Sequence, residues 1–193
     1  MKINIDKRLS KLVEDKPINL NLLVERWGNK FRIRKESLPE KGGLYAFWWI
    51  GNVEVLKNSE RKIELSGPRK IRIPVEFELS WIPREIKGIP LYIGKNARNL
   101  KSRVKQHLLL GANYHVHKKI ENEKSKPKTT SCQLRLGIEH LFPNEVEIRD
   151  FLLANVGITY IELNGSENTV DRFFLEDLAI GLFRPWFNVD SER

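Results

Sequence analysis

The stretch that decides the fold runs from Gly88 to Gly111 and reads GIPLYIGKNARNLKSRVKQHLLLG. It begins with a short apolar segment, residues 91–93, that is typical of a buried strand and ends at Gly94. A helix is predicted to follow, with Asn99 as its N-cap and Gly111 as the glycine that ends it. The stretch therefore predicts a strand, a turn and a helix in direct succession.

The predicted helix carries two polar side chains on its apolar side. At about 100° per residue, one arc of the helix collects the apolar residues Leu100, Val104, Leu108 and Leu110. Arg103 and His107 project into the same arc, one turn apart, whereas Lys101 and Lys105 point away from it. Burying a guanidinium or an imidazole is costly unless another group pairs with it. The two residues therefore mark a candidate site.

Two tripeptides resemble the paired half-motifs of a known family. Residues 43–45 read GLY and residues 92–94 read YIG, similar to the motifs that give the GIY-YIG nuclease family its name, with Leu44 in place of Ile. Tyr45 and Tyr92 lie 47 positions apart, which is wider than the usual gap in that family. The resemblance therefore implies an insertion between the half-motifs, at residues 51–88.

Further residues extend the resemblance over most of the chain. Lys95 directly follows the second half-motif, Arg103 comes eight residues later, and His107 four residues beyond that, as in the helix of the family. Near the C-terminus, Glu176 and Asn188 resemble the metal-ligand glutamate and the trailing asparagine of these nucleases. The resemblance implies an α+β fold with a small, mostly antiparallel central sheet flanked by helices, and a β-rich insertion.

The whole chain, residues 1–193, is interpreted as one domain, because a chain of this length can form one sizeable core. Residues 1–40 form an N-terminal region in which residues 1–18 are either a loose arm or a short helix and residues 19–27 are a predicted helix ended by Gly28. Residues 112–131 form a basic loop. Periodicity predicts strands at 44–50, 53–56, 62–65, 71–79 and 157–163, and helices at 132–142, 144–156 and 170–183. Asn144 and Glu147 form a pattern similar to a capping box for the second of these helices.

Composition excludes several classes of protein. The sequence has no run of 18 apolar residues, so no membrane partner is expected, and its first residues lack the apolar region of a secretory signal. A single cysteine, Cys132, excludes an internal disulfide and a cysteine-based zinc site. These features favour a cytoplasmic protein. His115 and His117 have no nearby carboxylate or thiol and are not expected to bind a metal.

Positive charge is concentrated in the middle of the chain. Residues 84–130 carry 12 Lys and Arg against 3 Asp and Glu, an excess equal to the net charge of +9 of the whole chain. Such a segment either keeps the protein soluble or binds a polyanion, and its position around the candidate site favours the second reading. The candidate phosphate- and DNA-binding residues are Lys95, Arg98, Lys101, Lys105, Lys118 and Lys119.

Hydrolysis of a phosphodiester needs charge neutralisation at the phosphate and help for the leaving oxygen. The predicted helix at 170–183 is apolar nearly all round and expected to be buried, so Glu176 needs either a cation or the Arg103 guanidinium beside it. The resemblance implies Mg²⁺ or Mn²⁺ at Glu176. Arg103 is the candidate for the scissile phosphate, and Lys95 either adds a second positive charge there or anchors the nucleic-acid backbone.

The residue that accepts the proton of the attacking water stays open. Tyr45 and Tyr92 are candidates through the resemblance, although a free phenol has a pKa near 10. His107 has a better-matched pKa and could act directly or through a tyrosine. Asn188 either fixes the geometry of the site by hydrogen bonds or is a turn residue after Pro185.

The resulting hypothesis is a metal-dependent DNA endonuclease of the restriction type, acting as a stand-alone domain. One site per chain and two strands to cut suggest a homodimer on DNA. A structure-specific repair or recombination nuclease and a non-catalytic nucleic-acid-binding module are the alternatives, and RNA is not excluded as a substrate.

Overall fold

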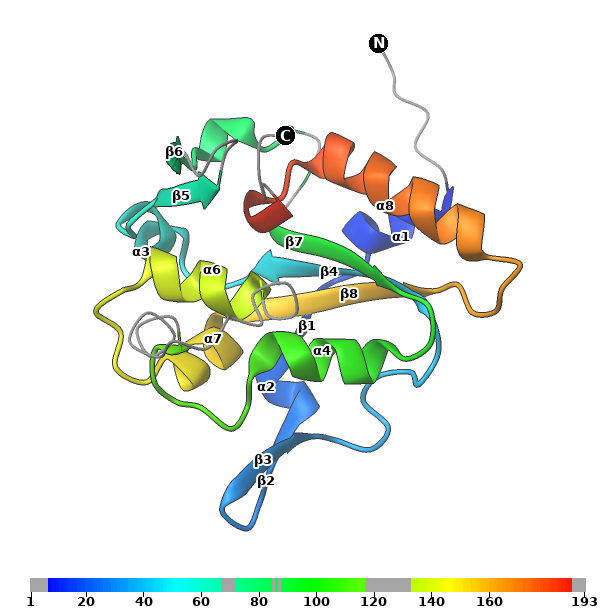
Figure 1. Cartoon of the computed structure of the whole chain (residues 1–193), viewed down its shortest axis with the longest axis horizontal. Helices are drawn as coiled ribbons and strands as arrows, with labels where there is room; N and C mark the ends of the chain where they lie inside the picture. Colours follow the sequence, from blue (N-terminus) through cyan, green and yellow to red (C-terminus); the bar gives the residue numbers. More distant parts are fainter. Residues whose placement is uncertain (1–6, 67–71, 85, 87, 117–132, 189–193) are drawn as a thin grey trace.

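A four-stranded antiparallel sheet forms the centre of the molecule (Figure 1). The computed structural model describes residues 7–66, 72–84, 86, 88–116 and 133–188. The strand order is β1-β8-β4-β7, with β1 at Ile18–Asn19, β8 at Val156–Glu162, β4 at Gly43–Trp49 and β7 at Ile89–Asn96. The predicted α+β class with an antiparallel central sheet is confirmed.

Helices cover both faces of this sheet (Figure 1). One face carries α4 (Leu100–Leu108), α6 (Gln133–Leu141) and α7 (Ile148–Asn155), and the other carries α1 (Lys7–Glu14) and α8 (Thr169–Phe183). None of the helices in the described part of the chain combines the length and the apolar character that a bilayer crossing requires. The sheet is therefore the middle of three layers.

The central strand β4 is buried along its whole length. Its side chains alternate between the faces, so that Tyr45, Phe47 and Trp49 enter the core under α4, α6 and α7. Leu44, Ala46 and Trp48 enter the core under α1 and α8. A strand covered on both faces reads as a continuous apolar run, which explains its aromatic sequence.

The N-terminal region agrees with the prediction in part. Of the two alternatives for residues 1–18, the short helix is confirmed: α1 buries Leu9 and Leu12 completely and is part of the fold, while residues 1–6 lie outside the described part. The helix predicted over 19–27 is wrong beyond its first turn: α2 (Leu20–Leu23) is followed by β2 (Val24–Trp27) and β3 (Lys30–Ile33). Gly28 does not stop a helix but has φ 59° in the two-residue turn between these strands, a position that favours glycine.

The region between the half-motifs contains the expected hairpin and an unexpected helix. β5 (Lys62–Ser66) and β6 (Arg72–Glu76) pair antiparallel, whereas the strand predicted at 53–56 is α3 (Val53–Lys57). The Asn52 side chain accepts a hydrogen bond from the Glu54 amide and so caps this helix. The strand predicted to reach residue 79 ends at Glu76 and is followed by the 3₁₀ turn η2 (Leu79–Trp81). Phe77 stacks on Trp186 at 5.3 Å, so the insertion shares the main core.

Helix α8 is amphipathic rather than buried all round. Leu175, Ala179 and Phe183 pack against the sheet. The opposite side exposes Val170, Phe173, Phe174 and Leu178. The expectation of a largely buried helix is therefore wrong, because apolar composition alone does not show how many sides of a helix are covered. Arg184, at φ 50°, ends α8 and leads into η4 (Trp186–Asn188).

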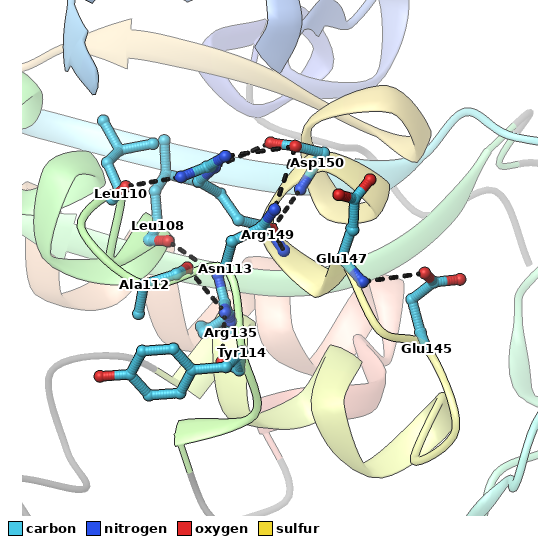
Figure 2. Close-up of polar contacts among 10 residues, drawn as sticks. All are labelled: Leu108, Leu110, Ala112, Asn113, Tyr114, Arg135, Glu145, Glu147, Arg149 and Asp150. Carbon is cyan, nitrogen blue, oxygen red and sulfur yellow. Dashed lines mark hydrogen bonds and ion pairs between the residues drawn. The ribbon is translucent and has the colours of Figure 1, made fainter. Parts of the chain in front are cut away.

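Helix α4 begins as predicted and ends earlier. The Asn99 side chain accepts a hydrogen bond from the Ser102 amide, which confirms the N-cap. The helix ends at Leu109, which has φ 45°, and not at Gly111. The segment after it is tied down by the buried Arg135, which donates to the carbonyls of Ala112 and Tyr114 at 3.0 and 2.9 Å (Figure 2). The start of the predicted basic loop is therefore ordered by the body of the protein, and its residues 117–131 lie outside the described part.

The N-terminus of α7 is capped from a distant part of the chain. The Asn113 side-chain oxygen accepts hydrogen bonds from the amides of Arg149 and Asp150 at 3.0 and 3.3 Å (Figure 2). Glu147 occupies the N-cap position without a side-chain bond of this kind. The capping box predicted at Asn144 and Glu147 is therefore wrong, because the helix starts at Ile148, three residues later than the box requires.

Replacing Asn113 by alanine is expected to lower the free energy of unfolding by about 1 kcal/mol, the usual cost of losing a helix cap. Asn144→Ala is the matched control, since its side chain is exposed, and is expected to stay within about 0.5 kcal/mol of the parent. Urea unfolding followed by circular dichroism measures both. A larger loss for Asn144→Ala would contradict the cap from Asn113.

Candidate active site

The hydroxyl of Tyr45 is the centre of a buried polar cluster. Tyr45 lies on β4 and is 0% exposed. Its Oη accepts a hydrogen bond from Arg103 Nε at 3.2 Å and lies 2.8 Å from His107 Nε2. Three of the predicted site residues are therefore brought together by one strand and one helix.

The imidazole of His107 is fixed as a hydrogen-bond donor to Tyr45. The backbone amide of Leu134, in the first turn of α6, donates to His107 Nδ1 at 3.5 Å. Because an amide only donates, Nδ1 must accept, and the neutral ring then carries its proton on Nε2. Burial, together with the nearby positive charge of Arg103, lowers the pKa of His107 to about 3. The ring is therefore neutral near pH 7 and points its N–H at the phenol.

Tyr92 lies beside this cluster on β7. Its ring centroid is 4.8 Å from that of His107 and 6.2 Å from that of Tyr45. Burial raises the pKa of Tyr92, and the charge and hydrogen bond of Arg103 partly offset that rise. The pKa of Tyr45 is also raised by burial, and to a larger extent. With 6% exposure, Tyr92 is the phenol nearer to solvent.

Gly94 is required for the close approach of the two phenols. It pairs with Tyr45 in the register of β4 and β7. A Cβ at position 94 would lie 2.5 Å from Tyr45 Oη and 2.8 Å from Tyr92 Cε1. The last glycine of the second half-motif therefore leaves the space that the Tyr45 hydroxyl occupies.

Glu176 reaches the same edge of the sheet from the opposite face. It lies on α8 and forms an ion pair with Lys95 of β7, with side-chain exposures of 14% and 31%. Lys95 follows Gly94 on an edge strand, so its side chain points to the α8 side while Tyr92 points to the α4 side. The negative charge of Glu176 raises the pKa of both tyrosines, so the carboxylate is close enough to act on them.

Asn188 holds the edge strand. Its Oδ1 accepts a hydrogen bond from the Ile93 amide, and its Nδ2 donates to the Ile93 carbonyl, both at 2.8 Å. The side chain thus takes the place of a neighbouring strand along β7. It fixes the segment that carries Tyr92, one residue before Ile93, and Lys95, two residues after it.

Apart from Lys95, which pairs with Glu176, the predicted phosphate-binding residues fall into three groups. Arg98 and Lys105 are exposed. Lys101 is engaged within the protein, where its Nζ donates to the Lys35 carbonyl at 2.7 Å and to Glu40 at 3.0 Å. Lys118 and Lys119, and also His117, lie outside the described residues.

The donors present fit a hard, mostly hydrated cation rather than a closed metal cage. Within residues 7–116 and 133–188, apart from the gaps given above, no group of three or more His, Cys, Asp or Glu side chains is placed to hold a metal. Glu176 offers a single carboxylate, and Mg²⁺ typically takes one or two carboxylates together with water and substrate oxygens. Such an ion would share the carboxylate with Lys95.

Comparison of the chain with known protein families, with curated proteins and with solved structures finds no match. The assignment of the site therefore depends on its own geometry. Sequence reasoning missed two parts of that geometry: the Leu134 amide that sets the tautomer of His107, and Lys95 as the partner of Glu176. A backbone amide leaves no signal in the sequence, and the ion pair joins residues 81 positions apart.

Acid is expected to destabilise the protein through His107. The unfolded histidine has a pKa near 6.5, so between about pH 6.5 and 3 the unfolded chain takes up a proton that the folded chain does not. The stabilisation is complete above that window and is lost as the pH falls. Between pH 7 and 5 the loss is about 2 kcal/mol. His107→Gln should lack it, and urea unfolding at both pH values measures the difference. Equal losses in parent and variant would contradict the buried neutral imidazole.

Gly94→Ala is expected to lower the free energy of unfolding by about 1–3 kcal/mol, because the new methyl group overpacks the two phenols. Gly111→Ala is the matched control, since nothing lies within 4 Å of a Cβ built there. That control is expected to change stability by less than about 0.5 kcal/mol. Thermal unfolding of the three proteins tests this, and equal stability of Gly94→Ala and its parent would contradict the packing described.

Proposed function

We propose that this protein is a metal-dependent endonuclease that hydrolyses DNA phosphodiester bonds, resembling the GIY-YIG nucleases. The observation that carries the proposal is the Tyr45 hydroxyl, which accepts a hydrogen bond from Arg103 and lies within bonding distance of His107 on one face of β7. The Lys95–Glu176 pair flanks it on the other face. The Tyr45 phenol, the guanidinium and the imidazole meet although they are far apart in sequence, and the carboxylate lies across the edge strand from them.

Each group suits one task in phosphoryl transfer. Arg103 is partly exposed and its Nη1 is also bonded to Gln106 at 3.1 Å, so the guanidinium is held on two sides. A pre-oriented, permanent cation is suited to stabilising charge on phosphate oxygens. Lys95 adds a second positive charge near the same edge strand.

Among the three candidates for the base, the geometry favours Tyr92. His107 is 0% exposed and donates its Nε2 proton to Tyr45, so it cannot take a proton from water directly. Tyr45 is equally buried. Tyr92 is the more accessible phenol, and its hydrogen bonds with Arg103 and Tyr45 each lower its pKa against the effect of burial. His107 and Tyr45 then act as positioning residues.

Glu176 is the residue that would hold Mg²⁺ or Mn²⁺, which when bound supplies charge neutralisation for the phosphate and the leaving oxygen. The ion pair with the Lys95 ammonium holds this carboxylate at the edge of β7. We further propose a restriction-type cut of both strands by a homodimer on DNA, with structure-specific cutting as the alternative.

A non-catalytic nucleic-acid-binding module is the second candidate. The observation that favours it is the ion pair itself, since Lys95 already satisfies the carboxylate that the metal would need. A site that had lost its metal would show the same pair. Measurement of cleavage decides between the two.

Supercoiled plasmid incubated with the protein and Mg²⁺ or Mn²⁺ is expected to be cut, and EDTA is expected to stop the reaction. Glu176→Gln should slow cleavage about 100-fold or more, with DNA binding retained in a gel-shift assay. Glu162→Gln is the matched control, because that carboxylate forms an exposed ion pair with Lys41 on the same molecule. Tyr92→Phe should slow cleavage by a similar factor.

If the protein binds DNA but cleaves neither plasmid nor branched DNA with either metal, the result favours the non-catalytic binding module and contradicts the endonuclease. Discrete fragments from long linear DNA would indicate sequence-specific cutting. Preference for branched DNA would instead indicate a structure-specific nuclease, and cutting of RNA alone would contradict the assignment of DNA.

A further inference from the structure

A basic two-stranded ribbon projects from the body of the protein next to the candidate site. The hairpin of β2 and β3 extends away from the sheet at the bottom of the view in Figure 1. Residues 24–35 carry five Lys and Arg and one Glu.

The two faces of the hairpin differ sharply. Val24 and Ile33 are opposite each other and buried, and Phe31 on the same face packs against the Arg149 guanidinium at 3.8 Å. Because side chains alternate along a strand, the other face presents Glu25, Trp27, Lys30 and Arg32. The inner face therefore anchors the ribbon on the core, and the outer face is left to solvent.

The outer face holds an exposed aromatic ring and an ordered guanidinium. Trp27 is 63% exposed. The Arg32 guanidinium lies 3.6 Å from the centroid of the Trp27 ring, and its Nε donates to Glu25 at 2.6 Å. Within the described residues, the Nη groups of Arg32 have no hydrogen-bond acceptor. Stacking on Trp27 on one side and the Glu25 carboxylate on another hold this guanidinium in position.

The hairpin and α4 together line a cleft in which basic side chains outnumber acidic ones. The cleft has a volume of about 270 Å³, with Arg32 on one side and Lys101, Ser102 and Lys105 on the other. Glu40 also lines it and pairs with Lys101. Lys101 bridges to the chain after the hairpin through the Lys35 carbonyl, which fixes the two elements together. The hairpin is thus a fixed extension of the helix that carries Arg103.

The position of the cleft relative to Arg103 suits a duplex. Arg103 points toward β4, whereas Lys101 and Lys105 line the cleft beside the hairpin. The site and the cleft are therefore separated by the width of α4. An α-helix with its side chains is about 10 Å across, which is less than the width of a DNA duplex. A phosphate at Arg103 and a contact at the hairpin can therefore belong to the same duplex.

We propose that the β2–β3 hairpin enters the major groove of B-form DNA, with Trp27, Lys30 and Arg32 toward the groove and Lys105 on an adjacent phosphate. The proposal deepens the nuclease function proposed above and rests on it for the position of the scissile phosphate. A B-DNA major groove is about 12 Å wide and admits a two-stranded ribbon. The deep, narrow major groove of duplex RNA does not. The occupant is therefore double-stranded DNA.

Binding by the full-length protein is measured in EDTA, so that no cleavage is needed, by fluorescence anisotropy with a labelled DNA duplex of about three helical turns. The variant Lys30→Gln with Arg32→Gln is expected to bind about tenfold more weakly or worse. The control Lys11→Gln with Lys57→Gln removes the same charge from exposed positions on α1 and α3, and should weaken binding less than about threefold. Thermal unfolding verifies that both variants fold.

Two further variants separate the contacts. Lys105→Gln is expected to lower the slope of log affinity against log salt by about 0.9, the value for one phosphate contact. Trp27→Ala is expected to weaken binding without changing that slope, because the side chain carries no charge. An unchanged affinity for Trp27→Ala would overturn the entry of the hairpin into the groove.

Other outcomes would also overturn the docking surface. The first is that the parent protein does not bind duplex DNA. The second is that the hairpin pair and the control pair of substitutions weaken DNA binding equally. The third is that the hairpin pair weakens binding to duplex RNA of the same sequence as much as binding to DNA. Plasmid cleavage is scored separately. If binding depends on the hairpin but no DNA is cleaved, the proposed nuclease function is contradicted and the proposed docking surface is supported. If DNA is cleaved but the hairpin variants bind it as the parent does, only the docking surface is contradicted.

Discussion

The structure depends on a single constraint: a phenol lies in the middle of the central strand, where both faces of the sheet are covered. A buried hydroxyl must find hydrogen-bond partners or pay the cost of desolvation. Tyr45 finds them in Arg103 and His107, one turn apart on α4. The pairing fixes the rotation of that helix over the sheet, and the Leu134 amide then fixes the imidazole from α6. One polar group in the core thus orients two helices.

The edge position of β7 has a second consequence. Residues of a central strand reach only one layer each, but an edge strand allows groups from both layers to meet at its rim. Tyr92 approaches from the α4 side, and the Lys95–Glu176 pair from the α8 side. Gly94 leaves the space in which the Tyr45 hydroxyl lies beside Tyr92, and Asn188 pairs with the amide and the carbonyl of Ile93 at this edge. The polar cluster on the α4 face and the ion pair on the α8 face are therefore separated only by the edge strand β7.

Local patterns predicted what local chemistry determines. The N-cap Asn99, the strand β8 and the hairpin β5–β6 follow from capping residues and alternation within a few positions. The predictions of helices failed where a residue far away in the sequence determines the local structure. Residues 24–27 have helical spacing but pair with β3, and α7 takes its cap from Asn113 rather than from Asn144. Among the site residues, the proximity of Tyr45 to Arg103 and His107 was accessible from the sequence only through the resemblance, and the Lys95–Glu176 pair was not.

The electrostatics of the rim explain how these groups influence one another. Burial raises the pKa of Tyr45 and of Tyr92, and the negative charge of Glu176 raises both further, while Arg103 acts in the opposite direction. A carboxylate on one face of the sheet therefore works against ionisation of the phenols on the other. Any positive charge that binds Glu176 weakens this opposition, because it cancels the field that the phenols experience. Charge on one face of the sheet therefore acts on the phenols of the other face across a single edge strand.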